Sequence, residues 1–230
     1  MANYSTYTNI ANATTWTAGE IIIRAGNTIA WYDFTDASTL TDDGGGKISI
    51  WKDKLLSGHD LAAAGTARPT LGAAGVVFGG GTTYMKAAAF VFGQPATIYF
   101  CGKHTAHEAN FRFFDGHVVD KSNLHQFNPS PNLALSYDNN VTDKLVLDTF
   151  GIVRCVFDGA SSYIQVNNEA GDGGSTGAAS FDGFTVGARY DGAGGNCAIV
   201  VKEIICRTVH DSAGDQTAII NYLNAKYTIY

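Results

Sequence analysis

The stretch of residues 30–71, AWYDFTDASTLTDDGGGKISIWKDKLLSGHDLAAAGTARPTL, constrains the fold more than any other part of the chain. An aromatic-rich segment leads into an Asp/Ser/Thr turn, a glycine hairpin and a second segment that carries W-K-D-K. A run of small residues then ends in R-P-T-L. This order of strand and turn signals predicts β-strands joined by tight turns.

Segments of the same kind recur along the rest of the chain. Short runs of β-branched and aromatic residues alternate with Gly, Asn and Asp clusters. They span residues 28–34, 47–53, 76–78, 97–103, 111–114, 123–127, 133–137, 144–147, 152–157, 162–166, 183–188 and 198–207. The number and spacing of these runs predict an antiparallel sandwich or jelly roll. In 152–157, alternation places Val153, Cys155 and Phe157 on one face.

One helix is expected near the C-terminus. Residues 215–226 place Ile219, Ile220 and Leu223 at helical spacing, and Tyr227 continues the same stripe. No second segment of the chain shows a comparable helical pattern, so the sequence predicts a single short C-terminal helix.

Composition excludes several classes of partner. Hydrophobic residues make up 45% of the chain and charged residues 16%, which is typical of a globular protein. The net charge is −6 and no basic stripe is present, so we expect no nucleic-acid partner. No apolar run approaches the roughly 20 residues that span a bilayer. The first twenty residues have neither the basic region nor the apolar core of a secretory signal peptide.

The four cysteines are expected to be buried thiols. Cys101, Cys155, Cys197 and Cys206 each lie in an apolar, strand-like context, and no C-x-x-C pair occurs. Such cysteines behave as small hydrophobic residues, whereas a zinc site or a disulfide framework favours closer spacing.

The order of several phrases resembles the concanavalin A-like lectin/glucanase superfamily, in its laminin-G-like branch of phage virion and bacterial surface proteins. The phrases are FTDAST, KISIWKDK, ARPTL, ATIYFCGK, FRFFDG, RCVFDGASSYIQVNN, FTVGARYDG and VKEIICR. The resemblance implies an all-β, two-sheet antiparallel jelly-roll sandwich at residues 28–230, with ligand loops at its concave side or rim. Residues 1–27 lie outside it and are predicted to be an N-terminal arm, a possible tether.

The carboxylates indicate no glycosidase motif. Retaining glycosidases need two carboxyl groups roughly 5–5.5 Å apart. The four glutamates, Glu20, Glu108, Glu169 and Glu203, lie far apart in the sequence, and none belongs to an E-x-D-x-E motif. We therefore expect a protein that is not an enzyme.

Metal sites have little support. His104, His107 and Glu108 match neither H-E-x-x-H nor its inverse, and are expected to form a polar rim. The resemblance keeps calcium as an alternative, with oxygen ligands from Asp42 and Asp43, from residues 138–140 or from Asp191. No other cofactor is expected.

Loops that combine aromatic rings with planar polar groups are the candidate glycan site. Aromatic faces stack on sugar C–H groups, while carboxylate, amide and guanidinium groups bind hydroxyls. The predicted glycan-binding residues are Arg112, Asp115, His117, His125, Tyr137, Asp138, Asn139, Arg189, Tyr190, Asp191 and Asn196.

The sequence therefore predicts an attachment or surface-display protein with a lectin-like domain on a phage virion. Capsid decoration, head fibre and tail-fibre receptor binding are the roles considered, with a cell-surface glycan or virion proteins as partners. A homo-oligomer, with a trimer as one form, is also expected, as is a virion surface or extracellular location. The alternatives are a carbohydrate-active enzyme, its carbohydrate-binding module, or a structural jelly roll that binds protein neighbours.

Overall fold

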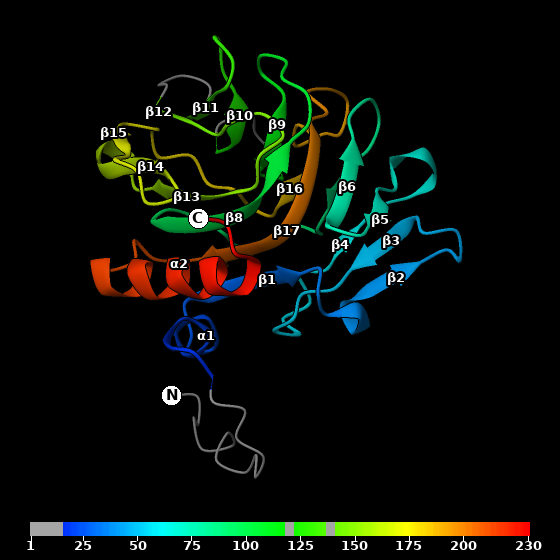
Figure 1. Ribbon diagram of the computed structural model, residues 1–230, viewed down its shortest axis with the longest axis horizontal. Helices are drawn as coiled ribbons and strands as arrows, with labels where there is room; N and C mark the ends of the chain where they lie inside the picture. Colours follow the sequence, from blue (N-terminus) through cyan, green and yellow to red (C-terminus); the bar gives the residue numbers. More distant parts are fainter. Residues whose placement is uncertain (1–15, 118–121, 137–140) are drawn as a thin grey trace.

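Two antiparallel β-sheets make up most of the protein in the computed structural model, which describes residues 16–117, 122–136 and 141–230 (Figure 1). The eight-stranded sheet has the order β15-β14-β13-β8-β17-β6-β5, and β1 also pairs with β17. The nine-stranded sheet has the order β12-β11-β10-β9-β16-β7-β4-β3-β2. This arrangement confirms the predicted all-β, two-sheet antiparallel sandwich with a C-terminal helix.

The eight-stranded sheet contains the longest strands. Its members are β1 (Thr28–Asp33), β5 (Thr70–Gly72), β6 (Gly75–Gly79), β8 (Ala96–His104), β13 (Gly151–Phe157), β14 (Ser162–Val166), β15 (Asp172–Gly174) and β17 (Ala198–Arg207). The nine-stranded sheet is built of shorter strands. They are β2 (Leu40–Asp42), β3 (Ile48–Trp51), β4 (Leu61–Ala62), β7 (Met85–Lys86), β9 (Arg112–Asp115), β10 (Leu124–Gln126), β11 (Asn132–Leu135), β12 (Val141–Lys144) and β16 (Thr185–Val186).

Helices lie on one side of the sandwich. They are α1 (Ala18–Arg24) and α2 (Ala213–Tyr227), and three single 3₁₀ turns lie in loops, η1 (Ala37–Thr39), η2 (Gly65–Ala67) and η3 (Gly159–Ser161). Figure 1 shows α2 lying along the eight-stranded sheet with α1 beside it. Within the described residues, neither helix is long and apolar enough to cross a membrane.

An aromatic core fills the space between the sheets. Tyr32 stacks on Phe184 with ring centroids 6.4 Å apart and meets the edge of Trp51 at 5.9 Å. The fully buried phenylalanines are Phe78, Phe92, Phe100, Phe113, Phe114, Phe157, Phe181 and Phe184. Buried aromatic rings dominate the energetics of such a core, because each removes a large apolar area from water.

The predicted alternation of β13 is confirmed. Val153, Cys155 and Phe157 face the aromatic core, whereas Ile152 packs under the helices. All four cysteines are buried and unpaired, as expected.

A second, smaller core joins both helices to the outer face of the eight-stranded sheet. It contains Ile23, Trp31, Tyr99, Cys101, Ile152, Ile205, Ile219, Tyr222 and Leu223. Helix α1 was not predicted and lies within the segment expected to be an arm. A capping box starts this helix, because Thr17 accepts a hydrogen bond from the Glu20 amide and Glu20 accepts one from the Thr17 amide. Residues 1–15 lie outside the described residues.

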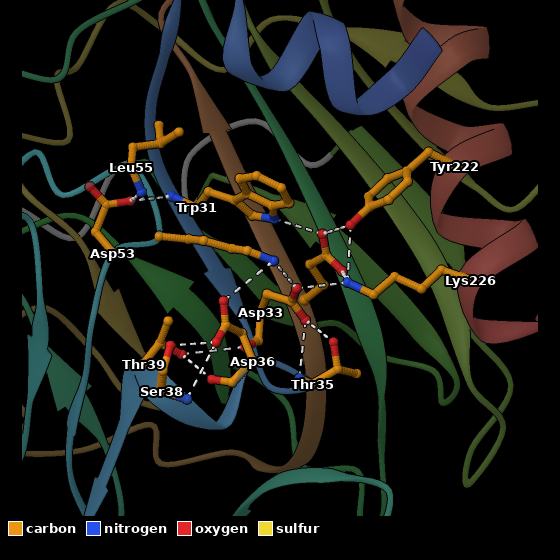
Figure 2. Close-up of polar contacts among 12 residues, drawn as sticks. Trp31, Asp33, Thr35, Asp36, Ser38, Thr39, Asp53, Leu55, Tyr222 and Lys226 are labelled. Atoms are coloured by element: carbon orange, nitrogen blue, oxygen red, sulfur yellow. Dashed lines mark hydrogen bonds and ion pairs between the residues drawn. The ribbon is translucent and has the colours of Figure 1, made fainter. Parts of the chain in front are cut away.

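Two carboxylates face each other beneath α2. Asp33 of β1 and Glu203 of β17 are cross-strand partners, and their exposed fractions are 1% and 0%. Like charges directly opposite each other destabilise a sheet. Lys226 of α2 compensates for this, since its Nζ lies 2.8 Å from Asp33 Oδ2 and 2.7 Å from Glu203 Oε2 (Figure 2).

The W-K-D-K motif belongs to the same network. Lys54 Nζ lies 2.6 Å from Asp33 Oδ2 and 4.4 Å from the centroid of the Trp31 ring. Asp53 accepts a hydrogen bond of 2.8 Å from the Trp31 amide. The motif therefore fixes β1 along the edge that does not pair with β17.

Glu203 is surrounded by hydrogen-bond donors. Trp31 Nε1 donates to it over 2.7 Å, Tyr222 over 2.9 Å and Tyr227 over 2.7 Å. Burial raises the pKa of Glu203, against the opposing effect of Lys226. Burial also acts to raise the pKa of Asp33, but the charge of Lys226 and hydrogen bonds from Lys226, Lys54 and Thr35 outweigh it and lower that pKa to about 2.

We predict that Lys226→Met lowers the free energy of unfolding by about 3–5 kcal/mol at neutral pH, because it leaves Glu203 buried opposite Asp33 without its cation. The loss should shrink at acid pH, where Glu203 takes up a proton. Urea denaturation measures both effects. Lys52→Met, at an exposed lysine, is the matched control, and an equal loss in the two variants would contradict the interpretation.

We also predict that the stability difference between the native protein and Asp33→Asn depends on pH. The folded pKa of about 2 lies below the unfolded value of 3.8. The ionised Asp33 therefore stabilises the folded protein at pH values above the unfolded pKa. This contribution to the free energy of unfolding is lost as the pH falls toward 2. The difference should narrow by about 2 kcal/mol between about pH 6 and about pH 2. A difference that does not vary with pH would show that the Asp33 charge contributes nothing.

Candidate functional site

An irregularity in β9 brings polar side chains to the outer face of the nine-stranded sheet. Leu124 pairs with Phe114, but the next residue, His125, pairs with Arg112, so β9 carries one extra residue at Phe113. Phe113 and Phe114 consequently both face the aromatic core. Such a bulge redirects the side chains that flank it, and it places Arg112 and Asp115 on the opposite face.

These polar residues form a buried group that holds the loop before β17. Asp115 accepts a hydrogen bond of 2.9 Å from the Tyr190 amide and one of 2.7 Å from the Gly116 amide. The Arg112 amide donates to the Gly195 carbonyl over 2.7 Å. We call Arg112, Asp115, Asn123 and His125 the polar base; their exposed fractions lie between 0% and 3%.

His125 is a neutral member of this base. Burial and the nearby charge of Arg112 lower its pKa to about 3. Its Nδ1 lies 2.8 Å from Asn123 Oδ1, which can only accept, so Nδ1 carries the proton. The polar base therefore contains a donor of fixed orientation whose charge does not change near neutral pH.

Above the base, the loop ends in an exposed tip. Arg189 donates to both carboxylate oxygens of Asp191, over 3.0 Å and 2.6 Å. The Arg189 guanidinium also lies 5.7 Å from the centroid of the Tyr190 ring. The hydrogen bonds from Arg189 are the main cause that lowers the pKa of Asp191. The tip thus presents a planar ion pair beside an aromatic ring.

Lys86 joins this loop to the segment at His117. Its Nζ donates to the His117 carbonyl over 3.0 Å and to the Tyr190 carbonyl. His117 Nδ1 lies 3.1 Å from the Ala87 carbonyl oxygen. His117 therefore borders the loop, and both its backbone carbonyl and its ring form contacts there.

A hollow of about 210 Å³ opens beside the polar base, and we call it the rim hollow. It lies where the Gly79–Gly80–Gly81 turn meets the β8–β9 loop and the start of β17. Gly80 has a φ of +73°, and a Cβ there would lie 3.4 Å from the Asn196 carbonyl oxygen. Glycine permits both this backbone conformation and the close approach of the two loops.

The lining of the rim hollow combines one aromatic ring with several polar side chains. These are His107, Glu108, Phe111, Gln126 and Asn196. Gln126 is held by its neighbours, since its Nε2 donates to His104 Nδ1 over 2.8 Å and its Oε1 accepts from the Glu108 amide over 2.8 Å.

His107 is the least satisfied of these side chains. Both of its ring nitrogens are buried and, within the described ranges, have no hydrogen-bond partner. Burial lowers the pKa of His107, and the backbone of Phe127 opposes this effect. An unpaired buried polar group costs about 1–3 kcal/mol, and a bound ligand can supply the missing partner.

The structure brings most of the predicted glycan-binding residues to one region. Arg112, Asp115 and His125 are in the polar base, and Asn196 lines the rim hollow. His117, Arg189, Tyr190 and Asp191 border or form the loop above. Tyr137, Asp138 and Asn139 lie outside the described residues. Their role in binding glycan stays a prediction.

Two features of the site differ from the prediction made from the sequence. That prediction placed His107 and Glu108 at a polar rim but did not include them among the glycan-binding residues. It also listed Arg112, Asp115 and His125 as ligand-facing, whereas the structure buries them as a base. The apolar pair Phe113–Phe114, which breaks the alternation of β9, was the available signal for the bulge.

The predicted calcium ligands have other partners where they are described. Asp42 accepts from the Gly44 amide and Asp43 from the Gly45 amide, as turn residues do. Asp191 binds Arg189. Residues 138–140 are outside the described residues, and calcium stays a prediction.

Comparisons with known proteins find the fold but no family. No protein-family profile and no curated sequence matches the chain. Solved structures do match. A Trypanosoma rangeli sialidase in complex with sialic acid has a TM-score of 0.60 at 10% identity, over 87% of this chain and 33% of that one. The chain thus spans about a third of the sialidase that it matches.

Two further structures share the fold. One is domain 4 of AbnA, a GH43 extracellular arabinanase from Geobacillus stearothermophilus, in complex with arabinotriose. It has a TM-score of 0.57 at 12% identity, and the match covers 85% of this chain and 97% of that chain. A GH54 α-L-arabinofuranosidase has a TM-score of 0.64 at 12% identity, with 89% and 64% covered. The class defined here is a β-sandwich that occurs in carbohydrate-active proteins.

These structures correct one expectation from the sequence. The prediction that the chain is not an enzyme was wrong, because the structures that share its fold come from glycosidases: a sialidase, an arabinanase and an arabinofuranosidase. The missing E-x-D-x-E motif could not support that prediction, since unrelated sets of residues carry out chemistry on one fold.

We predict that the His125 imidazole does not take up a proton between about pH 8 and about pH 5. Burial and Arg112 hold its folded pKa at about 3, whereas an unfolded histidine titrates near 6.5. The lowered pKa also means that stability falls as pH drops below the unfolded value. Imidazole NMR shifts measure the titration, and a midpoint near the unfolded value would contradict the buried polar base.

Proposed function

We propose that the chain is a carbohydrate-recognition domain of a carbohydrate-active protein and that the rim hollow takes one sugar residue. The observation that carries the proposal is the lining of this hollow. Phe111 supplies an aromatic wall, while His107, Glu108 and Asn196 supply donors and acceptors. Sites for small polar ligands combine apolar walls with a few placed polar groups in this way.

Each side chain has a definite part in the proposal. Phe111 stacks on the C–H face of the sugar ring. The Glu108 carboxylate accepts hydrogen bonds from hydroxyl groups, and the Asn196 amide both donates and accepts. The unpaired nitrogens of His107 gain a partner when a hydroxyl enters, and binding removes the cost of leaving them unpaired.

The polar base gives this site the rigidity that recognition needs. The backbone of Arg112 pairs with that of Asn196 in an isolated β-bridge, and the Arg112 side chain donates to the Asn110 carbonyl. The same residue therefore fixes both walls of the rim hollow. Side chains that are held by such supporting contacts lose less entropy on binding.

The comparisons support a carbohydrate ligand without identifying it. The arabinanase domain has almost the length of the matched part of this chain, and its structure contains arabinotriose. We therefore take arabinotriose as the first probe, followed by a glycan array that covers other oligosaccharides.

We predict that Glu108→Ala and Phe111→Ala each weaken oligosaccharide binding by roughly tenfold or more, because each removes a hydrogen bond to a charged group or a stacking surface. Titration calorimetry with the tightest ligand from the array measures this. Val91→Ala, at a valine with 89% of its surface exposed, is the matched control and should bind as the native protein does.

The same titrations decide the proposal. Binding that is equal in the native protein and in both rim variants would exclude the rim hollow as the site. No binding to any glycan on the array would overturn carbohydrate recognition. Release of reducing ends, assayed in parallel, would show whether the chain also cleaves what it binds.

We further propose a location for this domain, on the surface of a virion. The resemblance of the sequence to phage virion proteins supports placing this domain on a virion surface, with a cell-surface glycan or virion proteins as partners and with a trimer as one form of assembly. Mass spectrometry of purified virions tests the location, and sedimentation of the purified chain tests the oligomer.

A further inference from the structure

A second hollow, of about 500 Å³, lies on the part of the eight-stranded sheet that α2 leaves uncovered. We call it the edge hollow. Strands β13, β14 and β15 form its floor at the edge of the sheet, and the first turns of α2 flank it (Figure 1). The residues that matter for its chemistry are Arg154, Ser161, Tyr163, Gly173, His210 and Gln216.

The floor of the edge hollow is a row across three strands. Val156 pairs with Tyr163, and Tyr163 pairs with Gly173. Gly173 has no side chain, so the aromatic ring of Tyr163 borders an open strip of backbone. A flat ligand can lie on this strip, next to the ring.

Arg154 is held in a fixed orientation at one side of this floor. Its guanidinium lies 4.9 Å from the centroid of the Tyr163 ring. Its Nη1 donates to Gln216 Oε1 over 2.5 Å, and Gln216 Nε2 in turn donates to the Asp211 carbonyl over 2.7 Å. Two independent contacts thus position the guanidinium before any ligand binds.

One edge of this guanidinium makes no hydrogen bond to the part of the chain that the structure describes. Arg154 Nε is buried and has no hydrogen-bond partner among residues 16–117, 122–136 and 141–230. Gln216 takes Nη1, which leaves the edge formed by Nε and Nη2. Two parallel N–H groups on one edge of an arginine match the two oxygens of a carboxylate.

Two acidic groups beside the edge hollow, Asp158 and Asp211, already have partners in the protein. Asp158 lies 2.8 Å from His210 Nδ1, and Asp211 lies 2.7 Å from Arg207 Nε. The positive charge of Arg154 has no carboxylate opposite it among the described residues. An anion that enters the hollow therefore meets an arginine whose charge no acidic side chain pairs.

We propose that the edge hollow binds the carboxylate of an acidic sugar, a hexuronate within an oligosaccharide. Arg154 takes the carboxylate on its Nε edge, the sugar ring lies beside Tyr163 over Gly173, and Ser161 and His210 bind hydroxyls. This site is separate from the rim hollow, and the inference does not rest on sugar binding there.

Calorimetry with trigalacturonate and with its methyl ester tests the inference, because esterification removes the negative charge of each carboxylate and leaves the sugar rings and their hydroxyl groups the same. The native protein should bind the acid at least roughly tenfold more tightly than the ester. Arg154→Gln should remove this preference. Arg154→Lys keeps the positive charge but loses the two parallel N–H groups of the guanidinium. It should therefore retain only a minor part of the preference for the acid.

Lys144→Gln is the matched control, because it removes one positive charge from an exposed residue of β12 that does not line the hollow. It should bind trigalacturonate as the native protein does. Equal binding of acid and ester by the native protein would overturn the inference, and so would a preference that persists in Arg154→Gln.

A measurement on the native protein covers the case in which the Arg154 variants do not fold. The Arg154 Nε–H resonance and the Gly173 and Gly174 amides should shift on titration with trigalacturonate, whereas the Glu108 and Asn196 resonances should not. Shifts confined to the rim hollow would overturn the edge site while leaving carbohydrate recognition intact.

Discussion

Two buried carboxylates on adjacent strands are the interaction on which the arrangement of sheet and helices depends. Asp33 and Glu203 are opposite each other in register, and in water-free surroundings such a pair is unfavourable. Lys226 satisfies both, and it can do so only if α2 lies where it does. Lys54 completes the compensation from the other side. The hydrophobic contacts under α2 stabilise the helix, and in this position along the sheet Lys226 also contacts both carboxylates.

The other sheet uses a local irregularity for a similar purpose. The extra residue at Phe113 lets two phenylalanines enter the core and turns Arg112 and Asp115 outward together. Asp115 then fixes the loop at Tyr190 through a backbone amide, and the backbone of Arg112 pairs with that of Asn196. A binding surface built from loops is thereby supported by groups that are themselves buried and paired. The eight-stranded sheet has an irregularity of its own in β17, between Val201 and Glu203, but β13, β14 and β15 pair without a register shift and form the floor of the edge hollow.

The parts of the fold predicted from the sequence are those with a repeating pattern. The apolar residues of β13 recur at every second position, and those of α2 recur at helical spacing. Both patterns repeat more than once, so both elements were identified correctly. Strands β2, β4, β5, β7 and β15 were missed because each has only two or three residues, too few to show a period, and none lies within a longer predicted run. The predicted strand at 144–147 is instead β12 (Val141–Lys144). The contact between Asp33 and Glu203 joins residues 170 positions apart, and no local pattern reports it. The rim hollow likewise forms only when three distant loops meet.

The central claim is that the rim hollow binds sugar through Phe111, Glu108 and Asn196. A crystal structure of the protein soaked with the tightest ligand from the glycan array tests this most directly. The account predicts a sugar ring stacked on Phe111, with hydroxyl groups within hydrogen-bond distance of Glu108 and Asn196 and with the polar base unchanged. Sugar bound elsewhere on the protein, with the rim hollow filled only by water, would contradict it.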